Sequence, residues 1–178
     1  MNEYLPLIRG AAGVPEVRSR IAWSEIEAEL GLSLPEDYEE LLEGLPPGRF
    51  NDQFIDVRHP IFAGSSDRFV SGLKEFLGAL KEGRDLEKAL GDKAATHLAV
   101  YPEAGGILPW GRVEDDWIFA WKTAGEPSKW KSVAVSFEFN ELYPLPGSMS
   151  QALYRLIIGD TGVEELDYLS EMQNFVQD

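Results

Sequence analysis

The chain has 178 residues, a length that suits one domain, and its 44% hydrophobic and 26% charged residues are typical of a soluble globular protein. It contains no cysteine, which excludes disulfides, thiolate metal ligands and a cysteine nucleophile. The 31 acidic residues exceed the 16 basic residues, and the net charge of −15 disfavours nucleic acid and anionic membranes as partners, because both present phosphates.

An excess of acid keeps a protein soluble, and it also attracts a basic protein partner and speeds the encounter. The N-terminal stretch MNEYLPLIRGAAG lacks the charged start and long apolar run of a signal peptide. No stretch reaches the ~20 apolar residues that span a bilayer. We therefore expect a cytoplasmic protein.

The first part of the chain predicts a lead followed by two helices. Residues 1–20 show no clear period and are expected to be irregular or weakly helical. In the next stretch, WSEIEAELG, Ser24 suits an N-cap, Glu27 would complete a capping box, and Gly31 suits the left-handed end of the helix. A second helix is expected to have Pro35 at its first position and to end at a Pro-Pro-Gly break.

The middle of the chain predicts one strand and one long helix. Residues 50–62 mix apolar and polar side chains with some alternation, which indicates a strand. Residues 65–83 carry apolar residues at 3–4-residue spacing, which predicts an amphipathic helix. A further short helical piece is expected at residues 85–91.

From His97 the period changes from helical to alternating. Four strands are predicted, at residues 97–101, 106–113, 116–122 and 132–140. In the third strand Trp117, Phe119 and Trp121 share a face, which indicates an antiparallel meander with at least one buried side.

A last amphipathic helix is expected from Ser148, which can form a capping box with Gln151, to Gly159, which can end it. The acidic tail at residues 160–178 is expected to be helical and packed on the domain. The element order lacks the regular strand–helix alternation of a parallel sheet. It predicts an α+β fold, with an antiparallel sheet (a mixed sheet is the alternative) covered on one side by helices.

Two stretches resemble the SUKH superfamily, the Smi/Knr-like domains. The first is WSEIEAELGLSLPEDYEELL, where the Leu-Gly, Leu-Pro, acidic and aromatic positions of the family's opening motif are filled by Leu30, Gly31, Leu34, Pro35, Asp37 and Tyr38. The second, YPEAGGILPWGRVEDDWIFAW, resembles the strand, Gly-Gly, strand, acidic turn and Trp-ending strand of bacterial members. GEPSKWKSVAV and SMSQALYRLIIG resemble the following hairpin and the closing helix.

The resemblance divides the chain into a lead (1–20), a single SUKH-like domain (21–159) and the acidic tail (160–178). GLPPGRF after the second helix departs from the family's Gly-rich turn. The resemblance implies a compact α+β fold without a catalytic constellation. Its bacterial members imply an immunity protein that neutralises a cognate toxin, and its fungal members imply a regulator of cell-wall synthesis that acts through protein contacts.

The residues themselves offer no local catalytic motif. The two histidines, His59 and His97, lie near no Gly-x-Ser-x-Gly pattern, and a structural role is the simpler interpretation of both. A Ser-His-Asp triad stays open as an alternative, since its members can be far apart in sequence. GGILPWG lacks the Gly-Lys-Ser/Thr of a phosphate-binding loop, so we expect no nucleotide cofactor.

The acidic run Glu114-Asp115-Asp116 has three interpretations: a turn, a partner contact, or a metal or catalytic site. A calcium loop alternates its ligands, whereas these residues are consecutive, and no histidine is near in sequence to complete a zinc site. We expect a turn between two strands, because Asp side chains bond the local backbone there. We expect no metal and no cofactor.

The tryptophans divide between core and surface. Trp117 and Trp121 share a strand face, and at least one is expected in the core. Trp110 and Trp130 flank turns and are expected to be partly exposed. Exposed tryptophan beside carboxylates suits a protein interface, where aromatic side chains anchor and charges steer.

The leading hypothesis is a non-catalytic immunity-type protein that binds a basic toxin domain. Its candidate partner-binding residues are Asp52, Glu114, Asp115, Asp116, Trp117 and Trp130. The alternatives are a regulatory scaffold that binds a housekeeping protein, and a small-molecule-binding or hydrolytic enzyme. A deep pocket lined by carboxylates and a histidine would favour the enzyme.

Overall fold

The computed structural model describes residues 2–91, 97–139 and 141–178. Its helices are α1 (Leu5–Ala12), α2 (Trp23–Leu30), α3 (Glu36–Gly44), α4 (Pro60–Ala63), α5 (Ser66–Leu90) and α6 (Met149–Ile158), with 3-10 helices η1 (Pro127–Lys129) and η2 (Glu164–Ser170). Its strands are β1 (Gly48–Phe50), β2 (Ile55–Val57), β3 (Ile107–Val113), β4 (Trp117–Lys122), β5 (Lys131–Ser136), β6 (Leu142–Pro144) and β7 (Phe175–Gln177).

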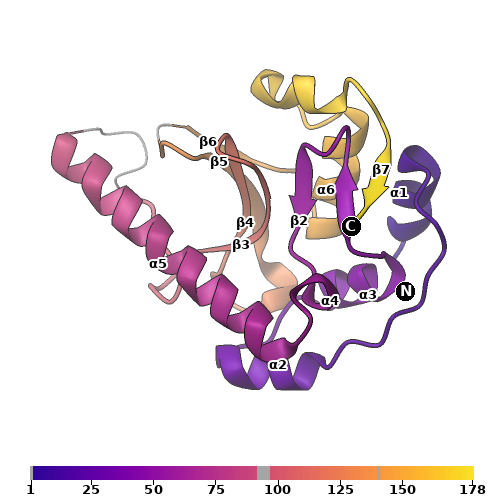
Figure 1. Ribbon diagram of the computed structural model, residues 1–178. Helices are drawn as coiled ribbons and strands as arrows, with labels where there is room; N and C mark the ends of the chain where they lie inside the picture. The colour runs from indigo at the N-terminus through magenta and orange to yellow at the C-terminus, as the bar shows by residue number, and fades with distance from the viewer. Residues whose placement is uncertain (1, 92–96, 140) are drawn as a thin grey trace.

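The strands of the described residues form one antiparallel sheet in the order β6-β5-β4-β3-β2-β1-β7 (Figure 1). The prediction of an α+β fold with an antiparallel sheet is therefore confirmed. The longest ladders join β3 to β4 and β4 to β5, which are the segments with the clearest alternation. The C-terminal strand β7 pairs with β1, so the acidic tail extends the sheet after η2.

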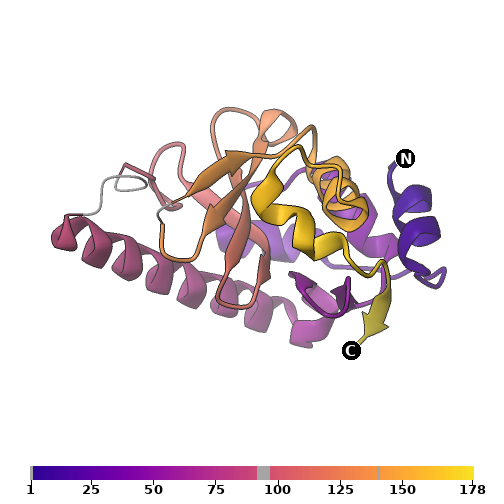
Figure 2. The ribbon, with the colours of Figure 1, turned by 90° about the horizontal axis from the view of Figure 1, so that it is seen from above.

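Helices lie on both faces of the sheet, which corrects the expectation of a cover on one side. Helix α5 runs along one face with α2 and α4 against it, and α6 lies on the opposite face with α1, α3 and η2 (Figures 1 and 2). Apolar side chains of α5 and α6 fill the space against the sheet: Phe69, Leu73, Leu77, Leu80, Ala152, Leu153, Leu156 and Ile157. Within the described residues, no helix is long and apolar enough to cross a membrane.

Local signals for helix ends were largely right. Gly31 and Gly159 adopt left-handed conformations with φ of 70° and end α2 and α6, and Ser148 caps α6 by accepting a hydrogen bond from the amide of Gln151. The Ser24 cap was wrong, because α2 begins at Trp23 and its N-cap is Ala22, two residues earlier. The carboxylate expected to complete the capping box, that of Glu27, instead accepts the amide of Leu34 at 2.8 Å.

The α5 prediction was too short. One continuous helix of 25 residues replaces the two expected pieces, and it ends at Gly91 with φ of 86°. Arg84 explains the extension, because its buried side chain bonds Glu103 and the carbonyl of Leu98 from the middle of the expected break.

Three strand predictions also change. Residues 50–62 contain β1, a turn, β2 and α4 rather than one strand. Residues 97–101 contribute a single bridge, from Val100 to Ile107. The last strand ends at Ser136, where a turn begins that is closed by the amide of Phe139 donating to the carbonyl of Ser136; Asn140, its expected end, lies outside the described residues.

Candidate functional site

The acidic run forms the turn between β3 and β4, as predicted. The amide of Asp116 donates to the carbonyl of Val113 at 2.8 Å, and Glu114 takes a left-handed φ of 23° to complete the reversal. All three carboxylates, on Glu114, Asp115 and Asp116, are exposed. The turn therefore presents a compact negative charge at one end of the central ladder.

The β1–β2 turn is connected to this acidic turn through η2. Tyr168 of η2 donates its hydroxyl to the Asp116 carboxylate at 3.1 Å, and its ring meets the ring of Phe54 edge-on at a centroid distance of 5.9 Å. Phe54 ends the β1–β2 turn, which also carries the exposed Asp52. The contacts thus place Asp52 and Asp116, which are far apart in sequence, in two turns on either side of one tyrosine.

Asn51 holds the β1–β2 turn in place. It is fully buried, and its side-chain amide donates to the carbonyl of Ile157 at 2.9 Å and to that of Leu169 at 2.8 Å. Asn51, Asp52 and Gln53 have φ of 53°, 55° and 71°, a left-handed run that Asn and Asp tolerate better than most residues. The turn is therefore fixed to the ends of α6 and η2.

The candidate tryptophans are buried rather than exposed on this surface. Trp117 is 6% exposed and packs on Tyr143 at 5.9 Å, so it belongs to the core beneath the turn. Trp130 is 9% exposed and donates to the carbonyl of Gly125. It also lies at the far end of the ladder from Asp116, because Lys131 pairs with Lys122 whereas Ser136 pairs with Trp117.

The expectation that Trp110 and Trp130 are partly exposed is therefore wrong. A register shift in β3 next to Trp110 turns its ring onto Phe119 at 5.4 Å, where it is fully buried. The exposed aromatic side chain on this surface is instead Phe54, at 41%. Sequence reasoning missed Phe54 and Tyr168, whose proximity to the acidic turn depends on tertiary packing.

Tyr168 borders a depression of about 330 Å³ beside the acidic turn, which is lined by Asp115, Asp116, Trp117, Ser136, Phe137, Glu138, Glu141 and Tyr168. Burial and the charge of Asp116 raise the pKa of Tyr168 to about 12. Burial and the carboxylates of Glu165 and Glu141 raise the pKa of Tyr143 to about 12. Both hydroxyls therefore keep their protons at neutral pH and can donate hydrogen bonds to the acidic surface.

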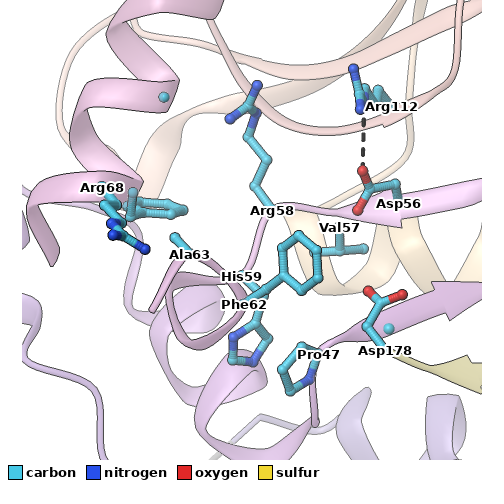
Figure 3. A pocket seen from close by; sticks show the side chains of 13 residues that line it. Pro47, Asp56, Val57, Arg58, His59, Phe62, Ala63, Arg68, Arg112 and Asp178 are labelled. Atoms are coloured by element: carbon cyan, nitrogen blue, oxygen red, sulfur yellow. Dashed lines mark hydrogen bonds and ion pairs between the residues drawn. The ribbon is translucent and has the colours of Figure 1, made fainter. Parts of the chain in front are cut away.

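A second hollow, of about 300 Å³, opens on the face of the sheet that carries α5 (Figure 3). It is lined by Pro47, Gly48, Asp56, Val57, Arg58, His59, Phe62, Ala63, Arg68, Phe69, Gly72, Arg112 and Asp178. Asp56 of β2 and Arg112 of β3 are register partners and form an ion pair at 3.4 Å. The hollow brings three arginines together in a chain with a net charge of −15.

His59 in this hollow has a structural role. Its Nε2 lies 3.1 Å from the carbonyl of Leu42 and 3.0 Å from that of Leu45, and its Nδ1 accepts the amide of Ile61. These partners identify the neutral tautomer with the proton on Nε2, and burial lowers its pKa. With both ring nitrogens occupied, His59 offers no free base. His97 is not part of this hollow's lining and lies at an exposed turn.

Among the residues that the structure describes, no three histidine or carboxylate side chains converge as a set of metal ligands. Comparison with protein-family models, with curated proteins and with solved structures finds no match to this chain.

Proposed function

We propose that this chain is a cytoplasmic, non-catalytic protein-binding domain that neutralises a basic toxin domain through its acidic surface. We define that surface as the β3–β4 turn (114–116), the β1–β2 turn (51–54) and η2. The observation that carries the proposal is the contact of Tyr168 with both Asp116 and Phe54, which joins these segments into one exposed face.

The charges on this face favour a basic partner. Besides the two turns, η2 carries Glu164, Glu165 and Asp167, all exposed. Like charges collected on one side of a protein raise the rate at which an oppositely charged partner arrives. Phe54, 41% exposed and in contact with Tyr168, supplies an apolar ring beside those charges that can anchor an interface.

The geometry gives the hydrolytic alternative less support. The hollow at Arg58 contains two carboxylates and a histidine, the composition that would favour an enzyme. Its histidine is committed to backbone groups on both nitrogens, so it cannot activate a water or a hydroxyl there.

The test is binding and neutralisation by charge-matched variants. Asp115→Asn/Asp116→Asn removes two charges from the acidic surface and keeps an oxygen that can accept from Tyr168. Glu75→Gln/Glu82→Gln removes two charges from the exposed side of α5 and serves as the control. The partner is isolated from the native host with the unchanged protein, identified, and tested for toxicity when expressed without it.

We expect a basic, toxic partner whose association is slowed at least about threefold at low salt by the Asp115/Asp116 change and left unaltered by the control. Rescue of growth from the toxic partner should be weaker with the Asp115/Asp116 variant than with the control variant. A non-toxic housekeeping partner would identify the regulatory scaffold instead. Equal association rates for the two double variants would reject the acidic surface.

A further inference from the structure

The hollow beside α5 is lined by three arginines, although the chain as a whole has a net charge of −15. Arg58 follows β2, Arg68 lies in the first turn of α5, and Arg112 lies on β3, and all three line the same space (Figure 3). In a chain with nearly twice as many acidic as basic residues, arginines are expected to be matched by carboxylates. Their local excess therefore requires a specific explanation.

The carboxylates of the hollow are already occupied. Asp56 pairs with Arg112 at 3.4 Å, and Asp178 pairs with Arg49 at 3.8 Å. Within residues 2–91, 97–139 and 141–178, Arg58 and Arg68 have no carboxylate within ion-pair distance. The hollow therefore presents two guanidinium groups whose charge the described residues do not neutralise.

Arg58 lines the hollow and has a donor without a partner. Its guanidinium carbon lies 4.5 Å from the centroid of the Phe76 ring, a cation–π contact that holds the group in place. Its Nε is buried and has no hydrogen-bond partner among the described residues. A buried donor without a partner costs about 1–3 kcal/mol, so such a group is usually found where a ligand or water supplies the missing acceptor.

Much of the remaining lining is apolar. Val57, Ala63 and Phe69 form part of the wall, and Phe62 stands at the opening with 67% of its surface exposed. Ligand pockets combine such apolar walls with a few placed polar groups, and about 300 Å³ lies at the small end of their range. The space suits a compact molecule with one charged end.

We propose that this hollow binds a small oxyanion, a phosphate or carboxylate carried on an aromatic or apolar body. Arg58 and Arg68 hold the oxyanion, and Phe62 covers the body. Arg112 pairs with Asp56, keeping that carboxylate from the ligand, and attracts the oxyanion electrostatically rather than through a direct hydrogen bond. This site lies on the α5 face of the sheet and is independent of the acidic surface, so either can fail without the other.

The experiment is calorimetric titration with phenyl phosphate, benzoate and inorganic phosphate, with phenol as the uncharged control. We expect phenyl phosphate or benzoate to bind with a dissociation constant of about 1 mM or below at low salt, and phenol not to bind. The Nε–H signals of Arg58 and Arg68 should shift in the same titration. Whichever of the two aromatic anions binds more tightly identifies the oxyanion.

Arg68→Gln should weaken binding about tenfold, because a charge-assisted hydrogen bond is lost, and the exposed position lets the variant fold. Phe62→Ala should weaken phenyl phosphate but not inorganic phosphate. Arg18→Gln, an exposed arginine outside the hollow, is the matched control and should leave all affinities unchanged. Equal loss in Arg68→Gln and Arg18→Gln, or a dissociation constant for both aromatic anions weaker than about 1 mM, would overturn the proposal.

Discussion

Asn51 gives the sharpest test of how the acidic surface is built. Replacing it with alanine removes the hydrogen bonds to the carbonyls of Ile157 and Leu169, at 2.9 and 2.8 Å, and leaves both acceptors buried. Each lost bond costs about 1 kcal/mol net, so the pair accounts for about 2 kcal/mol of the free energy of unfolding. Alanine at a φ of 53° adds about 1–2 kcal/mol of backbone strain.

The expected total for Asn51→Ala is a loss of about 3–4 kcal/mol. Asn51→Gly loses the same hydrogen bonds but tolerates the left-handed backbone, so it should be about 1 kcal/mol more stable than the alanine variant. With a urea slope of about 2 kcal/mol per molar, the alanine variant's midpoint should fall by about 1.5–2 M.

Urea titrations followed by tryptophan fluorescence and by far-ultraviolet circular dichroism measure both variants against the unchanged protein. Coincident curves from the two probes establish that the transition is two-state and that the free energies can be compared. The reasoning fails if Asn51→Ala loses less than about 1 kcal/mol, or if glycine is no better than alanine. The first result would mean that the bonds contribute nothing net, and the second that the backbone is not strained.

Three other changes test separate features. Burial and the charges of Glu27, Glu43 and Glu36 raise the pKa of Glu39 from 4.5 to about 7, so the native state binds a proton that the unfolded state releases. Stability should therefore decline as pH rises from 4.5 through about 7. Glu39→Gln should abolish this decline in urea melts recorded across that pH range. Arg84 lowers the pKa of Glu103 to about 2, so the stability contributed by the Glu103 carboxylate should be lost as pH falls from about 4.5 towards 2. Glu103→Gln should flatten the acid limb of the same melts. In thermal melts, Gly48→Ala should lower the free energy of unfolding by about 1–3 kcal/mol, because a β carbon there meets a backbone carbonyl of β7. Gly78→Ala, at an exposed position of α5 with open space around it, should raise the free energy of unfolding by up to about 1 kcal/mol. The opposite order of stability would contradict the β1–β7 pairing.

The elements that the sequence predicted well are those specified by local chemistry. The apolar period of α5, the alternation in β4, the glycines after α2 and α6 and the acidic turn after β3 all depend on neighbours within a few residues. The start of α2 was missed, because Ser24 makes no cap and the Glu27 carboxylate bonds the amide of Leu34 after the helix instead of the helix N-terminus.

The surface was harder to predict than the fold. Exposed carboxylates were placed correctly, because Glu114, Asp115 and Asp116 are both a turn signal and a charge signal. Trp110 and Trp130 were misplaced, because a position beside a turn indicated partial exposure, whereas packing on Phe119 and on Trp121 buries the two rings. Arg58 and Arg68 gave no signal at all, since they line one hollow only when β2 and α5 are adjacent in space.

The pairing of β7 with β1 has a consequence for synthesis in the cell. The partner of β1 is made after most of the other elements, so during translation the backbone donors and acceptors on that side of β1 stay open to solvent and to other nascent chains. A long-range pairing of this kind also slows folding, because the intervening loop must close before the contact forms. Fusing a bulky tag next to Phe175–Gln177 should therefore lower soluble yield more than the same tag at the N-terminal side of α1.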